Sequence, residues 1–457
     1  MSKRDSATRR DFLKTATAVA VGAPYVITSS MRRACAAPAN ERITMGIIGP
    51  GKQGLGLLKK FMRFSDTQMI AVCDVSTARR EYARKVVDDR YTGAKDQGSF
   101  KGCKAYADFR ALLARDDIDA VIIAVPDHWH AIVAIEACKQ GKDIYCEKPL
   151  SLTIHEARQM TKAVRKYDRI FQTGSQQRSE FEGKFHRACE LVRNGRVGAV
   201  QKVLVSVRHP NWNEYAVPCD LPAEPVPDGL DWNFWLGPAP LRDYHSKISP
   251  AGIPTKPPVE QRDKIAWYDH YPSWRDYREY SGGTMTDFGA HNFDIAQWGL
   301  GMDHSGPVEV IPPKDGEPMT YKYANGVIMQ KVPEINETQG VTFIGAEGSI
   351  EVTRTSLKLE PESIGAKPIP PDGVHLDKAE NQDHKLDFVN CVKSRKRPIA
   401  DVEIGAHSVT VCHLGNLAYW NNRTLRWDPE NWHFVGDDEA NSWLDRPKRA
   451  PWKLPAI

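Results

Sequence analysis

Two stretches of the chain carry side chains whose types and spacing suit proton transfer. In the first, Lys148 stands between Glu147 and Pro149, directly after the predicted strand 142–146. Ligands of parallel α/β sheets bind at the carboxyl ends of the strands, so a lysine at this position faces a binding crevice. The alternative is a surface lysine on a loop.

The second stretch follows Gly282 and Gly283 and has the spacing of a helix. Asp287, His291 and Asp294 stand at positions i, i+4 and i+7, which places them on one helix face. A carboxylate one turn away from a histidine can orient the imidazole and tune it as an acid or base. The same residues could bind a metal ion, or serve as a helix cap and a structural histidine. We expect no metal, because no further strong ligand cluster occurs nearby.

A glycine motif near the start of the chain adds a binding site for phosphate. The apolar run 43–48 leads into a complete G-x-G-x-x-G pattern, formed by Gly49, Pro50, Gly51, Lys52, Gln53 and Gly54. The first glycine makes a tight turn, the second lets backbone amides approach a pyrophosphate, and the third lets a helix pack on the strand. The free N–H groups of the helix that begins near Lys52 would bind the phosphates.

The next predicted strand, 68–73, points to a dinucleotide because it ends at an acid. Asp74 stands 20 residues after Gly54, where a carboxylate accepts hydrogen bonds from the ribose of an adenosine. This acid favours NAD, since the 2′-phosphate of NADP would lie against a carboxylate. Arg79 and Arg80 follow closely and could bind that phosphate, so NADP is the alternative cofactor.

The glycine motif, Asp74 and Lys148 come together only if the first part of the chain folds as a doubly wound parallel sheet. Apolar runs alternate there with helical patterns, as βαβ units require. The predicted strands are 43–48, 68–73, 119–125, 142–146 and 170–173. The run 119–125 ends at Pro126, and His128 and His130 follow at the same edge. We expect Pro126 and His130 beside the cofactor, although either histidine could instead cap the next helix.

After residue 179 the pattern changes to that of a second α/β domain. A mostly antiparallel sheet is indicated by short strands at 308–310, 319–323, 327–332, 341–345 and 349–353. A Trp- and Pro-rich insert, 219–272, is too long for a plain connection and is expected to form a functional loop or lid. The tail from Arg426 is expected to pack along the surface. We place substrate contacts at His209, Trp274, Arg275 and Asp294.

Residues 1–39 have the layout of an export signal. Thr8-Arg9-Arg10-Asp11-Phe12-Leu13-Lys14 matches the twin-arginine consensus. A weakly apolar run, 15–27, and small residues at 34–37 follow, and the run is too short for a transmembrane span. We therefore expect the twin-arginine export machinery as a partner and a periplasmic or otherwise exported location.

Net charge and chain length limit the kinds of partner and the number of domains that we expect. The first 39 residues hold seven basic and two acidic side chains, a balance of +5, so the rest of the chain carries −1 when the whole carries +4. A nearly neutral body argues against nucleic acid or an anionic membrane as a partner. A chain of 457 residues exceeds one ordinary core, so two domains are expected.

Three motifs together resemble the glucose–fructose oxidoreductase / inositol dehydrogenase (Gfo/Idh/MocA) family. They are the glycine pattern, Glu147-Lys148-Pro149, and Gly283-x-x-x-Asp287-x-x-x-His291, and the resemblance covers nearly all of the chain after the leader. It implies a Rossmann domain, 40–178, and a C-terminal α/β domain, 179–457, whose open sheet supports homo-oligomers. By the same resemblance Lys148 binds the reacting hydroxyl beside the cofactor, Pro149 is often cis, and His291 is the acid/base with Asp287 as its partner.

The resemblance implies an NAD(P)-dependent oxidoreductase that acts on a sugar, cyclitol or derivative. An exported enzyme would meet no recycling pool of free nucleotide, so we expect a tightly held cofactor that is regenerated within the site. The alternative is an NAD-dependent glycoside hydrolase or lyase that works through transient oxidation of the sugar. A third possibility is a non-catalytic, sugar-binding relative, against which the intact Lys148, Asp287 and His291 weigh.

Overall fold

The structure, a computed structural model, describes residues 42–92, 100–209, 212–252, 272–335 and 339–457. The signal predicted at 1–39 and part of the insert predicted at 219–272 lie outside these residues. Within the described part of the chain, no helix combines the length and apolar character needed to cross a membrane.

The N-terminal half of the fold is built on a six-stranded, all-parallel sheet of order β3-β2-β1-β4-β5-β6. Its strands are β1 (Ile43–Ile48), β2 (Thr67–Cys73), β3 (Lys104–Tyr106), β4 (Ala120–Ile123), β5 (Asp143–Cys146) and β6 (Phe171–Thr173). The strand order reverses between β1 and β4, which is where such sheets bind ligands. The predicted doubly wound sheet is confirmed.

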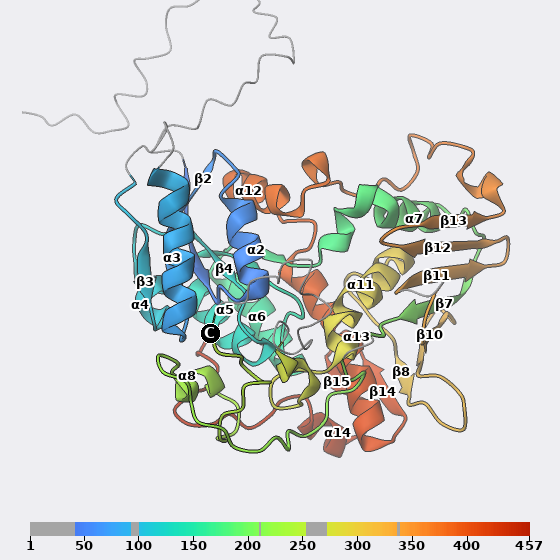
Figure 1. The fold of residues 1–457 in the computed structure, drawn as a ribbon. Coiled ribbons are helices and arrows are strands. Elements are labelled where there is room, and N and C mark those ends of the chain that lie inside the picture. The colour runs from blue at the N-terminus through green and yellow to red at the C-terminus, as the bar shows by residue number, and fades with distance from the viewer. Residues whose placement is uncertain (1–41, 93–99, 210–211, 253–271, 336–338) are drawn as a thin grey trace, which may run out of the picture. The chain divides into compact units, whose positions relative to one another are not determined.

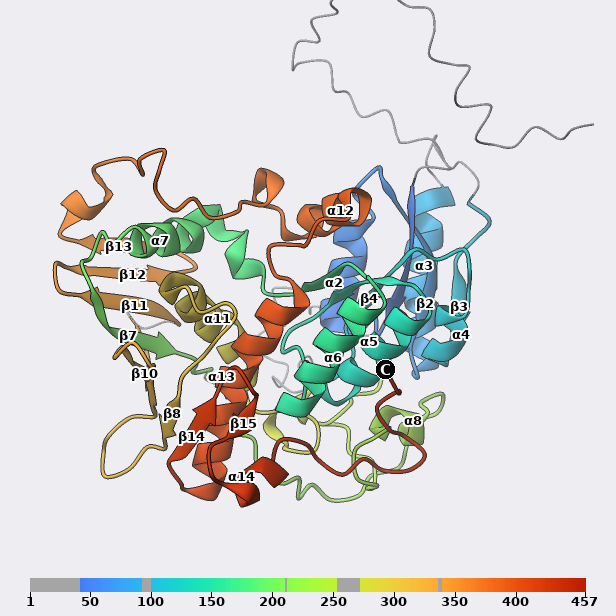
Figure 2. The same cartoon turned by 180° about the vertical axis from the view of Figure 1, so that it is seen from behind.

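Helices cover both faces of this sheet, so its central strands are apolar throughout. One face carries α2 (Lys52–Phe61) and α3 (Thr77–Thr92), which are in front in Figure 1. The other carries α4 (Phe109–Leu113), α5 (Asp127–Lys139) and α6 (Ile154–Lys166), which Figure 2 shows from behind.

The C-terminal sheet has nine strands in the order β13-β12-β11-β7-β10-β9-β8-β14-β15. They are β7 (Val200–Ser206), β8 (Glu309–Ile311), β9 (Thr320–Lys322), β10 (Ile328–Val332), β11 (Gly340–Gly345), β12 (Ser349–Thr353), β13 (Leu357–Glu360), β14 (Leu425–Asp428) and β15 (His433–Phe434). Only β7 and β10 pair in parallel, so the expectation of a mostly antiparallel sheet is confirmed. The tail prediction is wrong at its start, because β14 pairs with β8 and buries Leu425 and Trp427.

Among the described residues, helices cover one face of this second sheet. Helices α7 (Lys184–Arg193) and α11 (Gly289–Leu300) pack on it and bury the inward residues of the strands, among them Val203, Tyr321, Phe343 and Ile350. The outward residues of the same strands are only partly buried, and they include Leu204, Ile328, Thr342 and Ile344.

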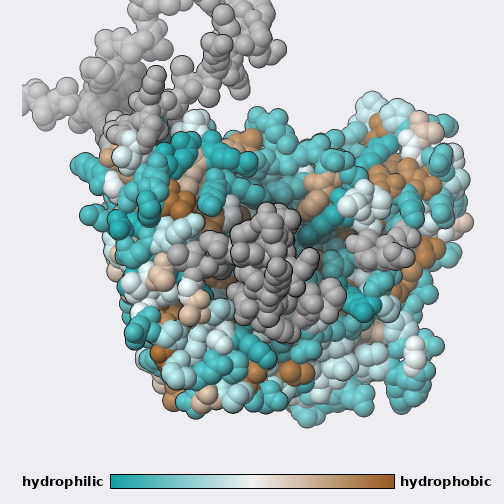
Figure 3. All heavy atoms as spheres, viewed as in Figure 1, coloured by the Kyte–Doolittle hydropathy of each residue, from teal (hydrophilic) through white to brown (hydrophobic). Residues whose placement is uncertain are grey.

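Two late helices return to the first sheet and tie the halves of the fold together. Phe388 of α12 (His384–Ser394) packs edge-on against Phe61 of α2 and Tyr145 of β5. Helix α13 (Val402–Asn421) packs against both α6 and α11. On the face drawn in Figure 3, hydrophilic residues predominate and the hydrophobic ones form small separate groups.

Candidate active site

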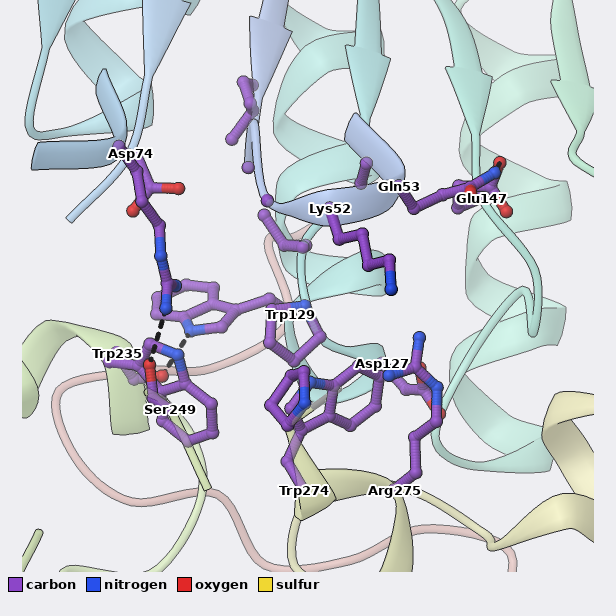
Figure 4. Close-up of a pocket in the computed structure, with 18 of the residues that line it drawn as sticks. Lys52, Gln53, Asp74, Asp127, Trp129, Glu147, Trp235, Ser249, Trp274 and Arg275 are labelled. Atoms are coloured by element: carbon purple, nitrogen blue, oxygen red, sulfur yellow. Dashed lines mark hydrogen bonds between the residues drawn. The ribbon is translucent and has the colours of Figure 1, made fainter. Parts of the chain in front are cut away.

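A cavity of about 640 Å³ lies at the carboxyl edge of the parallel sheet, a size typical of small-molecule sites. The first domain contributes the loop after β1, the ends of β2 and β4, and Glu147 and Lys148 after β5. The second domain contributes the loop that contains Arg275 and the start of α11. In Figure 4, Asp74 and Glu147 lie on opposite sides of the glycine loop, and Asp127, Trp274 and Arg275 lie across from Lys52.

The glycine loop has the shape that its sequence predicts. Gly49 has a φ of 83°, and a Cβ there would lie 2.8 Å from the backbone of Ala124. A Cβ on Gly54 would lie 2.3 Å from the carbonyl oxygen of Gly49, so this glycine permits helix packing and does not line the cavity. A Cβ on Gly51 would meet nothing within 4 Å, which leaves room for a ligand.

Helix α2 begins at Lys52 without a side-chain cap and without an acid in its first turn. The dipole of the helix favours an anion at this terminus, and no acidic side chain of the first turn opposes it. Gln53 lines the cavity and donates a hydrogen bond of 2.8 Å to Glu147. These residues fit the pyrophosphate of a dinucleotide.

Asp74 and Arg79 line the predicted adenosine end. Asp74 is buried, which raises the pKa of its carboxyl group, and one oxygen accepts a hydrogen bond from the amide of Ser76. Arg79 does not stand free for a 2′-phosphate. Its guanidinium donates to the carbonyls of Pro250 at 2.6 Å and Gly252 at 3.4 Å, and lies 3.5 Å from the hydroxyl of Ser249.

The described part of the insert lies against the loop that follows β2. The amide of Thr77 donates to the carbonyl of Gly229 at 2.8 Å, and the amide of Asp231 donates to that of Val75 at 3.2 Å. Trp235 of α8 (Trp232–Leu236) and the segment 248–252 line the same end of the cavity (Figure 4). The insert thus forms one wall of the predicted nucleotide site.

Lys148 and Asp287 make the central contact of the opposite end. The ammonium of Lys148 donates to Asp287 Oδ1 at 2.8 Å and to its backbone carbonyl at 3.1 Å. The Nε of Arg275 donates to the same Oδ1 at 2.9 Å. Burial alone would raise the pKa of Asp287, but Lys148 and Arg275 together hold it well below its usual range. The peptide bond between Lys148 and Pro149 is cis.

His291 lies in the cavity wall as a neutral imidazole. Burial, with the charges of Lys148 and Arg354, lowers its pKa well below 6.5. Its Nδ1 is buried and has no hydrogen-bond partner among the described residues. Asp287 Oδ1 accepts hydrogen bonds from Lys148 and Arg275, and none of the described hydrogen bonds joins Asp287 to His291. Phe288 stands between α10 (Thr284–Asp287) and α11 with helical φ and ψ, so Asp287 and His291 lie one turn apart and both line the cavity.

Three residues predicted at the site do not line the cavity. Asp294 is fully buried, and its carboxylate accepts hydrogen bonds from Arg178 at 2.8 and 2.9 Å and from Ser408 at 2.7 Å. A position three residues beyond His291 on α11 therefore points into the core, and the prediction of Asp294 as a substrate contact is wrong.

His130 is the second of these residues, and Gly54 is the third. The ring of His130 is buried, with Nδ1 2.7 Å from the carbonyl of Pro149 and Nε2 2.9 Å from that of Val125. It thereby joins the loop after β5 to the end of β4 and positions Lys148 without reaching the cavity. His130 thus has a structural role, which differs both from the expected contact with the cofactor and from the alternative of a helix cap.

The remaining predicted site residues do line the cavity, namely Gly49, Gly51, Lys52, Gln53, Asp74, Pro126, Glu147, Lys148, His209, Trp274, Arg275, Asp287 and His291. Sequence reasoning missed Asp127 and Arg354. Asp127 is a buried acid at the start of α5 that accepts a 2.6 Å hydrogen bond from Ser281, and burial raises its pKa to about 7. Its position directly after Pro126 could have revealed it. Arg354 follows β12, and no motif marks it.

The described residues contain no group of three side chains arranged to hold a metal ion. Their arrangement fits a nicotinamide dinucleotide, with pyrophosphate at the glycine loop, adenosine beside Asp74, and the reactive ring toward Lys148. Such a cofactor would supply a hydride acceptor or donor next to the Lys148–Asp287 contact and His291. The fold and the site together define a nucleotide-dependent redox protein of two α/β domains.

Comparison with protein families identifies the class more narrowly. Residues 43–175 match the NAD-binding Rossmann fold of the Gfo/Idh/MocA oxidoreductase family. Residues 183–251 and 264–454 match the C-terminal alpha/beta domain of the same family. The chain therefore belongs to the Gfo/Idh/MocA oxidoreductase family.

A curated relative and two solved structures illustrate its neighbours. Glycosyl hydrolase family 109 protein 2 of Shewanella sp. strain ANA-3 is 33% identical over 162 residues, which make up 32% of this chain and 35% of that protein. The match thus spans about a third of the relative's length.

The structural neighbours share the fold at low identity. Aldose-aldose oxidoreductase from Caulobacter crescentus, complexed with glycerol, has a TM-score of 0.54 and 17% identity over 84% of this chain and 99% of its own. The WlbA dehydrogenase from Bordetella pertussis, in complex with NADH and UDP-GlcNAcA, has a TM-score of 0.55 and 14% identity over 85% and 99%.

Proposed function

We propose that the protein transfers a hydride between NAD and a hydroxyl-bearing carbon of a sugar, cyclitol or glycoside. The observation that carries this proposal is the meeting of Lys148, Asp287 and His291 in one cavity with the glycine loop and Asp74. A lysine bound to a carboxylate and a neutral histidine are the groups that alcohol oxidation needs, since a proton must leave the oxygen as the hydride leaves the carbon.

Each side chain has a distinct part in this reaction. Lys148 donates a hydrogen bond to the reacting oxygen and stabilises the alkoxide that develops there. His291 accepts the hydroxyl proton, for which its low pKa keeps it in the required neutral form. Asp287 holds the ammonium of Lys148 in place, and Arg275 fixes the same carboxylate oxygen.

The residues at the adenosine end of the cavity favour NAD over NADP. A 2′-phosphate would need a cation near Asp74, and both candidates already donate to backbone carbonyls, Arg79 to those of Pro250 and Gly252 and Arg80 to that of Asp74. The carboxylate of Asp74 would also repel it. Titration of the purified protein with NADH and NADPH, followed by fluorescence, tests this, and equal affinity for the two would contradict it.

The second candidate is glycoside cleavage through transient oxidation of the sugar. It is supported by the similarity to glycosyl hydrolase family 109 proteins, and it uses the same Lys148 and His291 to oxidise the ring before elimination. In that reaction NADH is re-oxidised within each turnover, so the glycosidic bond breaks without net change in nucleotide.

One experiment separates the two candidates. The purified protein with bound nucleotide is incubated with a panel of free sugars, cyclitols and aryl glycosides. Products are identified by mass spectrometry, and the amount of NADH is followed by absorbance during the reaction. Oxidised product with matching NADH indicates a dehydrogenase. Free aglycone with constant NADH indicates the glycosidase. A panel without any turned-over carbohydrate contradicts the proposed function.

We also propose that the protein is exported by the twin-arginine pathway with its nucleotide bound, which the motif in residues 1–39 supports. The half-exposed outward face of the nine-stranded sheet further supports a homo-oligomer, since a face with Leu204, Ile328 and Ile344 gains from burial. Cell fractionation with a twin-lysine variant of Arg9 and Arg10 tests the export, and light scattering of the purified protein tests the assembly.

A further inference from the structure

The substrate end of the cavity holds more positive than negative charge. Lys148 and Arg275 share the single carboxylate of Asp287, and Arg354 lines the same wall. Of the other acids in this part of the cavity, Asp127 is bonded to Ser281 and has a pKa of about 7, and Glu147 accepts a hydrogen bond from Gln53 and has a pKa that burial raises. These acids do not neutralise the three cations.

Arg354 is the cation with the least compensation. Its Nε donates to the side chain of Gln177 at 3.0 Å, and Gln177 is itself held by a 2.9 Å bond to Asn292. Its guanidinium lies over the rings of Phe181 at 4.9 Å and Phe288 at 5.7 Å. No acid among the described residues forms an ion pair with it. Burial lowers the pKa of Arg354, and the charges of Asp287 and Glu180 act in the opposite direction without an ion-pair contact.

Arg275 lines the same cavity and is also held by aromatic rings. Its guanidinium lies 4.1 Å from the ring of Trp274 and 5.0 Å from that of Trp212, and Nε is bonded to Asp287. No described residue accepts a hydrogen bond from its terminal nitrogens. Two arginines fixed by aromatic faces are pre-organised to bind an anion, because little side-chain freedom is lost on binding.

The pyrophosphate of the cofactor does not account for this surplus. That group is expected at the glycine loop and the start of α2, whereas Arg354 follows β12 in the second domain and lies beside Phe288 and His291. A partly buried arginine without an acid is costly unless a ligand supplies the opposite charge. A carboxylate fits best, since its two oxygens match the planar donor fork of one guanidinium.

We propose that the substrate is an acidic carbohydrate, a uronic acid or uronoside, whose carboxylate is bound by Arg354 with support from Arg275. This inference rests on the proposed function for the position of the sugar ring between Lys148 and His291. Arg354 then determines specificity, because a neutral sugar leaves the guanidinium desolvated and unpaired, and a site built for a charged group rejects the uncharged analogue.

The test compares matched acidic and neutral substrates. Turnover of D-glucuronate, D-galacturonate and their methyl glycosides by the protein with bound NAD is compared with that of D-glucose, D-galactose and theirs. The variants are Arg354→Gln, Arg354→Lys and, as a matched control, Arg426→Gln, which changes an exposed arginine on the same sheet.

We expect kcat/KM for the preferred acid to exceed that of its neutral counterpart by at least tenfold, mainly through KM. Arg354→Gln lowers kcat/KM for the acid at least ten times more than for the neutral sugar, Arg354→Lys restores part of the difference, and Arg426→Gln keeps the wild-type ratio. Equal use of both classes, or an equal loss on both in Arg354→Gln, overturns the proposal.

The inference and the proposed function can fail separately. If no sugar is turned over, calorimetric titration of the same acids and neutral sugars into the NAD-loaded protein still measures recognition of the carboxylate. Binding of an acid that Arg354→Gln weakens supports the inference while the hydride-transfer function fails. Absence of binding by every acid tested overturns it.

Discussion

At the scale of single residues, the contact of Lys148 and Arg275 with Asp287 carries both stability and chemistry. Replacing Asp287 by Asn would leave two partly buried cations without a counter-charge. We expect the free energy of unfolding to fall by about 3 kcal/mol and the activity to fall with it. Denaturant unfolding at pH 7 measures the first. The control Asp372→Asn, at an exposed loop acid, should match wild type, and an equally small effect at Asp287 would contradict the account.

His291 sets the expected dependence of activity on pH. Because its pKa lies well below 6.5, the imidazole stays neutral and able to accept a proton through mildly acidic conditions. The acid limb of kcat/KM should therefore lie below pH 6.5, and His291→Gln should lose it together with most of the rate. A pH–rate profile with an acid limb at or above 6.5 would show that His291 is not the base of this site.

Asp127 sets a dependence of stability on pH with the opposite sign to that of a paired acid. Burial raises its pKa from 3.8 to about 7, so the folded protein binds a proton that the unfolded chain releases above pH 4. Its stabilising effect is complete below pH 4 and is lost as the pH rises toward 7, by roughly 4 kcal/mol at most. Asp127→Asn lacks this loss. Unfolding free energies of both proteins at pH 4.5 and 7.5 should diverge, and parallel values would refute the assignment.

At the scale of elements, the insert and α3 are joined by Arg79 over the adenosine end of the cavity. Arg79→Ala removes the bonds to Pro250 and Gly252 and frees the segment that lines the nucleotide site. We expect NADH to dissociate about ten times faster, because part of one wall is no longer fixed. Stopped-flow release of NADH measures the rate. Arg90→Ala, at an exposed position of the same helix, serves as control, and an unchanged rate in Arg79→Ala would mean that the insert does not retain the nucleotide.

The elements of the first domain could be predicted because their signals are local. The apolar runs, the glycine pattern and the acid after β2 can each be recognised from neighbouring residues. The structure places the glycine loop and Asp74 together at the carboxyl edge of the sheet that the apolar runs form. The direction of Asp294 could not be predicted from spacing alone. Asp287 and His291 both line the cavity, whereas Asp294, one turn further along α11, is bonded to Arg178 in the core because a buried arginine needs a carboxylate there.

At the scale of the whole molecule, the contacts that were not predicted are those between segments far apart in the sequence. Arg354, which follows β12, lines the same cavity as His291 of α11 because both elements belong to the second domain. No sequence motif predicts that the two residues lie in one cavity. In the same way α12 completes the core around Phe61 and Tyr145, although it stands more than 200 residues after both. Such contacts depend on topology, which periodicity does not specify.

The candidate site takes side chains from both domains. Lys148 follows β5 of the first sheet, and Asp287 and His291 belong to helices that pack on the second. Helix α13 packs against α6 and α11 and so joins the elements that position these groups. Hydride transfer therefore requires the domains to keep this arrangement.

The central claim is that Lys148 acts on the reacting oxygen of a carbohydrate. The most direct measurement is the steady-state turnover of Lys148→Ala, with bound NAD confirmed by absorbance, on the best carbohydrate of the panel. The account predicts a loss of at least a hundredfold in kcat while the nucleotide still binds, because the developing alkoxide loses its charged donor. Turnover equal to that of the wild-type protein would contradict it.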